Sequence, residues 1–457
     1  MAGIGFELRK VLKKGSLLSL GKMYAYSGIL SSGPWVISIL AIILVGFINI
    51  TAMSTMEQTV QFQVVITYAI ALASSLIITG TVQLPYTRYV ADTIFAGRKQ
   101  DVLSSYFGTL FIVWLTGVPI IWMLVTYAFP LESTLFKMEV VTVFLVLCAV
   151  WISNVLATSL KFFKGVVLAY FVSYGLIVLF SYLIPADLQT LLIIFIVGNV
   201  LLLALLMSFI ALEYDSKEFM HFRFFDRKKF YWKLGLAGLF YNLGTWIDKF
   251  IFWYHPLTGH AVIGKVNASV VYDLPIFMAY LSIIPGMAIF FYRLESDFAE
   301  WYDKYFEAVR KDGTLALIEE YRNEMATTIR HAMREIIVYQ GIIDIIIFLV
   351  APSIFHTLKI PMIYLDLFFV LTVGALLQLG FMSVLAILFY LDRRSEAMWL
   401  SILFFILNAF LTWQTIYMGP SWFGYGYAVS LLIVFSLGLW VLEKVMENMD
   451  YETFMLR

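Results

Sequence analysis

Twelve long apolar runs are the feature that most constrains this chain. All of them reach the roughly 20 residues that an α-helix needs to cross the hydrocarbon core of a bilayer. Hydrophobic residues make up 61% of the 457 residues and charged residues only 14%, and the mean hydropathy is +0.87. A soluble domain carries about 25% charged residues, so we predict an all-α, polytopic membrane protein. The predicted spans are 24–50, 62–84, 102–129, 140–160, 165–184, 190–212, 234–254, 269–292, 336–355, 362–391, 398–417 and 423–442.

The distribution of basic residues predicts the orientation of these spans. If the chain starts in the cytoplasm, 27 of its 31 Lys and Arg residues fall in cytoplasmic segments. Lys137, Lys265 and Lys359 fall in external loops, and Lys249 falls inside a span. Basic residues concentrate on the cytoplasmic side of multi-pass proteins. We therefore predict an inner-membrane protein with both ends in the cytoplasm, surrounded by membrane lipids.

A basic segment at 213–233 separates six predicted spans from six. We expect a cytoplasmic N-terminal segment at 1–23, a six-helix bundle at 24–212, a basic linker at 213–233 and a second bundle at 234–457. The N-terminal segment reads either as an amphipathic surface helix or as a basic flank of the first span. Equal halves are typical of transporters built from repeats. Gly33-Pro34-Trp35 and Gly244-Thr245-Trp246 occupy matching places in the two halves, through a repeat or by chance.

Five ionisable residues fall inside predicted spans: Asp248, Lys249, Asp273, Asp344 and Asp366. Charge in a membrane interior is costly, so such residues are candidates for a functional role. Asp248 and Lys249 point about 100° apart on a helix, so we expect them not to pair with each other and take Asp273 as a partner for Lys249. The alternative is a buried ion pair that only fixes helix register. Asp366 is expected at the membrane interface.

Aromatic and amide side chains accompany the charged pair in span 234–254. Tyr241, Asn242 and Trp246 lie within two helical turns of Asp248, a mixture that suits sugar rings. Trp and Tyr faces stack on the apolar faces of sugars and attract cations. We predict a substrate path along these residues and Trp35.

Helix-breaking residues interrupt three of the predicted spans. Each proline removes a backbone hydrogen bond and permits a bend. The bends are either gates or static kinks that neighbouring helices stabilise. The candidate gating positions are Gly33, Pro34, Pro119, Pro275 and Pro285.

One cytoplasmic loop, 293–334, is long and rich in charges of both signs. Asp312-Gly313 is a natural turn between two helices. One interpretation is a pair of solvated helices lying on the membrane surface. The other is a docking platform for a cytoplasmic partner, in which Trp301, Tyr302 and Tyr305 contribute an aromatic face.

The chain contains no motif for catalysis or for cofactor binding. Its single cysteine and five scattered histidines show no metal-ligand spacing, and no Walker A or HExxH sequence occurs. We therefore expect no enzyme activity, no cofactor and no metal, and we expect no nucleic-acid partner.

Several stretches resemble the Pel exopolysaccharide transporter family, PelG. They are Met1-Ala2-Gly3-Ile4-Gly5-Phe6-Glu7-Leu8-Arg9-Lys10, Tyr26-Ser27-Gly28, Ser31-Ser32-Gly33-Pro34-Trp35, Trp246-Ile247-Asp248-Lys249-Phe250 and Tyr272-Asp273-Leu274-Pro275. The resemblance places the chain in the superfamily of multidrug and oligosaccharide flippases and implies two six-helix bundles around a cavity. It also implies a complex with a cytoplasmic glycosyltransferase, a cyclic-di-GMP-binding membrane protein and a small scaffold protein.

The expected function is export of a hexosamine-rich, partly cationic polysaccharide from the glycosyltransferase to the periplasm. Acidic residues in the spans would suit a cationic sugar chain. Two alternatives stay open: an ion-coupled flippase or antiporter for small molecules or lipid-linked sugars, and a non-transporting membrane scaffold for the synthase.

Overall fold

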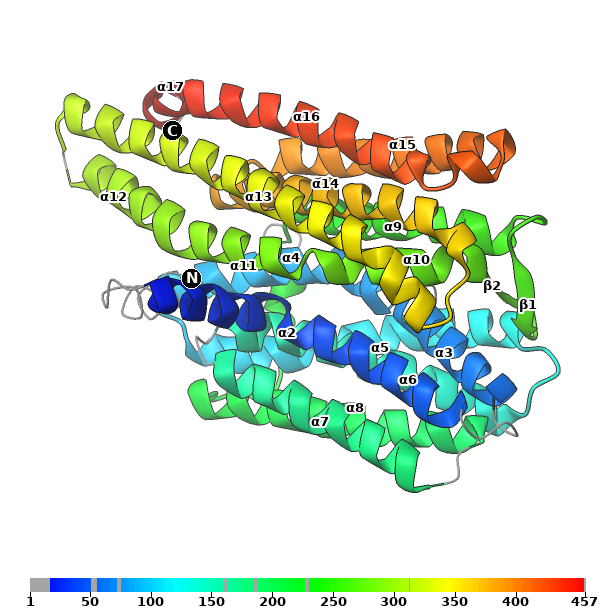
Figure 1. Ribbon diagram of the computed structural model, residues 1–457. Helices are drawn as coiled ribbons and strands as arrows, with labels where there is room; N and C mark the ends of the chain where they lie inside the picture. The colour runs from blue at the N-terminus through cyan, green and yellow to red at the C-terminus, as the bar shows by residue number, and fades with distance from the viewer. Residues whose placement is uncertain are drawn as a thin grey trace. The chain divides into compact units, whose positions relative to one another are not determined.

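The computed structural model describes residues 17–50, 56–71, 75–159, 163–184, 187–226, 230–311 and 313–455. In these ranges nearly all of the chain is helical (Figure 1). Two short strands, β1 (His260–Ile263) and β2 (Val266–Ala268), form an antiparallel hairpin that the sequence analysis did not anticipate. Most of the predicted amphipathic segment at 1–23 lies outside the described residues.

Eight helices in the described ranges are long and apolar enough to cross a membrane, and a bent pair of helices raises the number to nine. These eight candidate spans correspond to α5 (Gln100–Ala128), α6 (Thr134–Ser159), α7 (Phe163–Leu183), α8 (Leu188–Glu213), α13 (Leu315–Thr357), α14 (Leu365–Tyr390), α15 (Arg394–Met418) and α16 (Tyr425–Glu447). The chain is therefore an all-α polytopic membrane protein, as predicted. Short 3-10 turns lie at η1 (Arg223–Phe225), η3 (Met362–Tyr364) and η4 (Pro420–Trp422).

The remaining predicted spans also fall on helices, with two differences in detail. Run 24–50 lies in α2 (Leu17–Ile50) and run 234–254 lies in α9 (Trp232–Tyr254). Run 62–84 is divided between α3 (Met56–Ala71) and α4 (Ser75–Phe95), and α4 continues eleven residues beyond the apolar run. Run 269–292 is divided between α10 (Val270–Ser282) and α11 (Ile284–Tyr292). These belong to the bent pair, in which α10 and the helical stretch Ile284–Arg310 differ in direction by 40°.

The chain forms two compact units whose boundaries differ from the predicted division at 213–233. One unit combines described residues up to Gly33 with Val271 onward, and the other comprises Pro34–Val270. The difference arises because α9, which follows the predicted linker, packs along α4 and so belongs to the unit Pro34–Val270. The first boundary falls at Gly33-Pro34, a predicted gating position inside α2.

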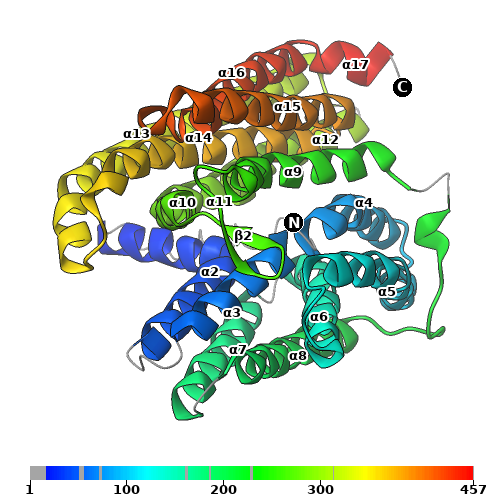
Figure 2. The same cartoon turned by 90° about the vertical axis from the view of Figure 1, so that its right-hand side faces the viewer.

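In the unit Pro34–Val270, α6 packs against α3, α4, α5, α7 and α8. Apolar side chains of α6 such as Phe144 and Cys148 are fully buried there. The β1–β2 hairpin is tied to the end of α5, because the Lys265 N–H donates to the Ala128 carbonyl at 2.7 Å. Figure 2 shows α7 and α8 lying together beside α6, consistent with their packing contacts.

In the other unit, α14 and α15 both pack along α16, and α13 packs on α14 (Figures 1 and 2). Small residues bring these helices close together. A Cβ at Gly374 would lie 2.6 Å from the Tyr427 ring, and one at Gly426 would lie 2.4 Å from the Thr412 nitrogen. Such contacts are typical of helix packing in membranes.

The predicted loop 293–334 is helical and turns at Gly313. After the π-helical segment η2 (Arg293–Phe298), α12 (Ala299–Arg310) packs against α13. The expected turn is therefore present, but α13 is a single helix of 43 residues, about 64 Å long, which continues into the predicted span 336–355. Residues 315–335 are thus continuous with the helix of the predicted span, and the position of this hairpin relative to the membrane surface stays a prediction.

Candidate functional site

The first buried polar site is the charged pair on α9. Asp248 and Lys249 are both completely buried. The Lys249 ammonium donates to both carboxylate oxygens of Asp248 at 3.2 Å and to the Thr245 carbonyl at 2.8 Å. The prediction that these neighbours do not pair is therefore wrong. The four-carbon stem of lysine is flexible enough to fold back along the helix and bring its charge to the adjacent carboxylate.

The pair lies on a helix that is held very close to α4. A Cβ at Gly238 would lie 2.2 Å from the Gly80 carbonyl oxygen, so only glycine fits at this crossing. One helical turn further on, Asn242 donates from its side chain to the Leu76 carbonyl at 3.0 Å. This bond gives Asn242 a structural role in the state described here, and the polar face of α9 is fixed by it.

A group of aromatic rings begins beside the pair within the same unit. The Lys249 ammonium lies 5.5 Å from the centre of the Trp246 ring, which is 9% exposed. Trp253 stacks on Tyr68 with ring centres 4.6 Å apart and lies 6.3 Å from Trp246. The Tyr68 hydroxyl in turn donates to the Asn267 carbonyl of β2 at 2.6 Å. The site is thus a buried ion pair beside Trp246, whose ring is the first of three neighbouring aromatic rings.

The second buried polar site is centred on Gln340 of α13, at the break between α10 and α11. The Gln340 amide nitrogen donates to the Ser282 carbonyl at 2.9 Å, and its amide oxygen accepts from the Gly286 N–H at 2.9 Å. Ser282 and Gly286 are four residues apart and would bond to each other in an uninterrupted helix. Gln340 therefore takes the place of one missing backbone bond at the bend.

Asp344 lies one turn further along α13 and shares this site. Its Oδ1 accepts from the Gln340 amide at 2.7 Å, and the residue is 3% exposed. Its Oδ2 is buried and has no hydrogen-bond partner among the described residues. An unsatisfied carboxylate oxygen in a membrane interior is costly, which marks Asp344 as a candidate for binding or proton exchange.

The predicted gating positions differ in what the backbone does at each. Pro34 and Pro119 lie inside the continuous helices α2 and α5, and Pro275 lies inside α10. Pro285 is in the first turn of α11, directly after the 40° bend. Of these four prolines, Pro285 therefore lies beside a helix break in the described residues. This is the break that Gln340 bridges.

The other predicted site residues lie elsewhere. Asp273 is half-buried in the first turn of α10, and its predicted pairing with Lys249 stays a prediction. Asp366 is exposed in the first turn of α14, as an interfacial residue would be. Trp35 and Tyr241 are half-buried in α2 and α9.

The predicted aromatic docking face is partly buried. Tyr305 is 0% exposed and donates to Asp450 of α17 (Met449–Met455) at 3.0 Å, and burial raises the pKa of Tyr305 to about 12. It therefore stays a neutral donor and cannot belong to an accessible docking surface in this state. Trp301 and Tyr302 are half-buried and keep some exposed area.

A comparison with known protein families shows to which family this chain belongs. The family described as "PelG: Putative exopolysaccharide Exporter (EPS-E)" matches residues 1–454. The chain belongs to the PelG family. The resemblance inferred from the sequence is thereby confirmed. No curated protein matches this PelG-family chain.

Solved structures show that the PelG-family chain has the fold of the MATE and MOP transporters. An outward-facing MATE transporter of the MOP superfamily matches with a TM-score of 0.63 at 14% identity, covering 94% of this chain and 97% of its own. An inward-facing one has a TM-score of 0.55 at 13% identity, covering 92% and 95%. A MOP superfamily transporter from Pyrococcus furiosus has a TM-score of 0.63 at 13% identity, covering 94% and 96%. Family and fold are those of membrane transporters.

Sequence reasoning missed Gln340 of this PelG-family protein because it counted only ionisable residues. A signal was available, since Gln340 and Asp344 are four residues apart and share a helix face. Glu139 of α6 was also missed; it is 7% exposed and its Oε2 has no partner among the described residues. Residue 139 immediately precedes the predicted span 140–160, where it read as a loop residue.

Proposed function

We propose that this PelG-family transporter exports a hexosamine-rich, Pel-type polysaccharide from a cytoplasmic glycosyltransferase to the periplasm. The observation that carries the proposal is the family match over residues 1–454. The charge distribution supports a location in the bacterial inner membrane with both ends in the cytoplasm. We further propose that the spans form two six-span halves, 24–212 and 234–457.

The polar face of α9 is the proposed contact for the sugar chain. Sugar hydroxyls can satisfy Asp248 and Lys249 when the pair separates, and the apolar face of a pyranose ring can stack on Trp246. Both charges are buried in this state, so contact requires a second conformation. Transporters of the same fold have been solved facing outward and facing inward, which supports such a change.

The α10–α11 bend is the proposed gate. Gln340 can release Ser282 and Gly286, which then bond to each other as an ordinary helical pair. The bend would straighten by one backbone hydrogen bond, while Gln340 keeps its bond to Asp344 and its freed amide oxygen needs a new donor such as water or a sugar hydroxyl. This exchange replaces two hydrogen bonds to Gln340 by one between Ser282 and Gly286, and it gives the unit two discrete arrangements.

The proposed partners are the glycosyltransferase, a cyclic-di-GMP-binding membrane protein and a small scaffold protein. The projecting hairpin of α12 and α13 is the proposed contact with them, through the partly exposed Trp301 and Tyr302 rather than through Tyr305. Replacing 299–334 with a flexible linker should release the glycosyltransferase from the membrane complex. A pull-down in which the enzyme is retained would contradict this contact.

Deletion of this protein in a strain that keeps the synthase tests the proposed export. We expect polymer to be absent from the periplasm and medium, while the synthase still turns over sugar nucleotide in membranes. Normal secretion by the deletion strain would overturn the proposal. If the deletion abolished both synthase turnover and secretion, the result would instead support the scaffold alternative.

An ion-coupled antiporter is the second candidate, favoured by the unpartnered Asp344 Oδ2. A carboxylate that exchanges a proton or Na⁺ can couple an ion gradient to a conformational change. In proteoliposomes, an imposed proton or Na⁺ gradient should drive efflux of small cationic dyes, and Asp344→Asn should abolish it. Gradient-independent dye fluxes, equal with and without Asp344→Asn, would exclude this candidate.

A further inference from the structure

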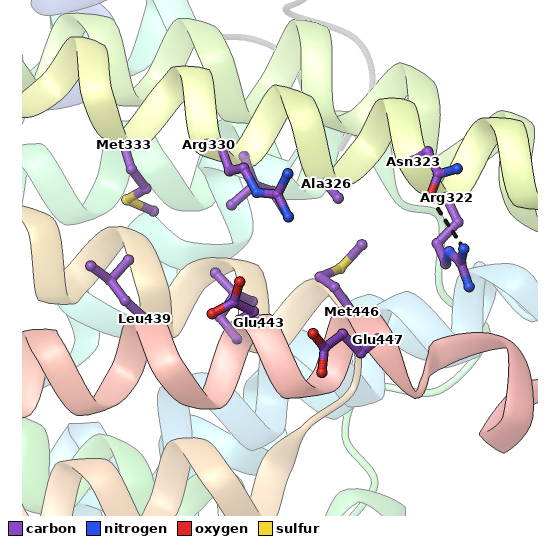
Figure 3. Close-up of a pocket in the computed structure, with 11 residues that line it drawn as sticks. Arg322, Asn323, Ala326, Arg330, Met333, Leu439, Glu443, Met446 and Glu447 are labelled. Carbon is purple, nitrogen blue, oxygen red and sulfur yellow. Dashed lines mark hydrogen bonds between the residues drawn. The ribbon is translucent and has the colours of Figure 1, made fainter.

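A cleft of about 500 Å³ lies between one end of α13 and one end of α16 (Figure 3). Both helices belong to the same compact unit. The cleft is open on one side and combines apolar with charged walls. Its lining includes Arg322, Arg330 and Met333 from α13 and Leu439, Glu443 and Glu447 from α16.

The charges in this cleft face each other without pairing. Figure 3 shows Arg330 pointing from α13 toward Glu443 on α16. Arg330, Glu443 and Glu447 are exposed, and none of them makes an ion pair with a described residue. Arg322 differs, because it is already bonded to Asp450 and to Asn323. One wall thus offers an unpaired cation and the other wall two unpaired carboxylates.

The cleft lies at the depth of lipid headgroups. Arg330 precedes the apolar run 336–355 by six residues, which is about 9 Å along a helix. Glu443 directly follows the apolar run 423–442. The headgroup region extends about 5–8 Å beyond the hydrocarbon core on each side. Glu443 therefore stands within the layer of lipid phosphates and ammonium groups, and Arg330 lies at the outer edge of that layer.

The apolar part of the cleft continues along the membrane-spanning parts of both helices. Met333 and Leu439 line its deeper end. One turn further on α13, Ile337 is 42% exposed, and two turns deeper on α16, Leu432 is 50% exposed. Residues at these spacings share a helix face. An acyl chain can follow these exposed side chains without displacing any helix.

We propose that this cleft binds a zwitterionic phospholipid with a primary ammonium, such as phosphatidylethanolamine. The lipid phosphate bonds to the Arg330 guanidinium and its ammonium bonds to Glu443 and Glu447, so each unpaired charge gains an opposite partner. The lipid bridges α13 and α16 through its headgroup. This assignment is independent of the exported cargo.

Charge and hydrogen bonding distinguish this lipid from other membrane lipids. Phosphatidylglycerol has the phosphate but no cation for the two glutamates. Phosphatidylcholine has a cation, but its quaternary ammonium has no N–H to donate to a carboxylate. A docked basic peptide would satisfy the glutamates and leave Arg330 unpaired.

Native mass spectrometry of the delipidated full-length protein, titrated with each of the three phospholipids, tests the proposal. We expect phosphatidylethanolamine to bind at least fivefold more tightly than either of the other two. Glu443→Gln should remove the preference over phosphatidylglycerol while binding of the latter stays. Arg330→Ala should weaken the binding of all three.

The matched controls are Glu324→Gln and Arg334→Ala, exposed residues of α13 outside the cleft lining. Both should keep the wild-type preference, and all four variants should unfold at similar temperatures because they alter exposed side chains. Equal binding of the three lipids would overturn the proposal. So would a preference that survives both Glu443→Gln and Arg330→Ala, or one lost equally in the controls.

Discussion

The two buried polar sites differ in how individual side chains satisfy their charges. Lys249 and Asp248 form a completely buried pair, so each removes the need to solvate the other. Asp344 has one bonded oxygen and one without a partner among the described residues. The first arrangement favours stability of one state, and the second favours exchange with an external ligand or proton.

The charged pair can be separated into its structural and functional contributions. Asp248→Asn or Lys249→Met alone leaves one buried charge unpaired, which we expect to cost about 3–5 kcal/mol of stability. The double variant removes both charges and should be more stable than either single variant. Thermal unfolding of the purified proteins measures this coupling.

Secretion by the double variant then decides the role of the pair. If the charges contact the sugar chain, the double variant folds but exports little polymer. Normal export would show that the pair only fixes helix register.

Gln340→Met tests the bridged break in α10–α11. Methionine has a similar length but cannot bond to Ser282 or Gly286, so the two groups must pair directly or stay unsatisfied. We expect a loss of about 1–3 kcal/mol in stability, together with reduced export. A stability and an export rate equal to wild type would contradict the role given to Gln340.

Sequence alone could locate these residues better than it could describe their contacts. Asp248, Lys249 and Asp344 stand out because charge is rare in apolar runs. Their partners do not, since the fold of the Lys249 side chain and the insertion of Gln340 between Ser282 and Gly286 depend on tertiary packing.

The close crossing of α4 and α9 positions the charged pair and makes a second prediction. In Gly238→Ala the new methyl group would collide with the Gly80 carbonyl, a backbone atom that cannot rotate away. We expect a loss of about 1–3 kcal/mol, as in overpacked cores. Thermal unfolding of the purified variant measures this loss.

Gly175→Ala is the control, because a Cβ there meets nothing within 4 Å on helix α7. It should gain up to about 1 kcal/mol through helix propensity. Equal effects of the two substitutions would argue against a close crossing.

Helix positions were easier to predict than helix continuity. Apolar length alone predicted the location of spans, but run 62–84 is shared by α3 and α4, and charged residues 315–334 are helical together with span 336–355. Polar residues end an apolar run without ending a helix, which explains the second difference. Apolar length does not show where one helix ends and the next begins, which explains the first. The burial of Tyr305 against α17 was likewise invisible, because Asp450 is 145 residues away.

For the protein as a whole, cysteine labelling can test the proposed orientation, because the single native cysteine is buried. Cys148 is completely buried, so a membrane-impermeant maleimide should not label the unmodified protein. In spheroplasts, Lys265→Cys should react from outside, whereas Arg310→Cys should react only after permeabilisation. The reverse pattern would invert the proposed topology.

Polymer export into inverted membrane vesicles tests the central claim most directly. The vesicles contain the synthase complex with or without this protein and receive radiolabelled sugar nucleotide at their exposed cytoplasmic face. We predict that polymer becomes resistant to an added glycoside hydrolase only when this protein is present, because the chain has entered the lumen. Polymer that is equally protected, or equally digested, in both kinds of vesicle would contradict the account.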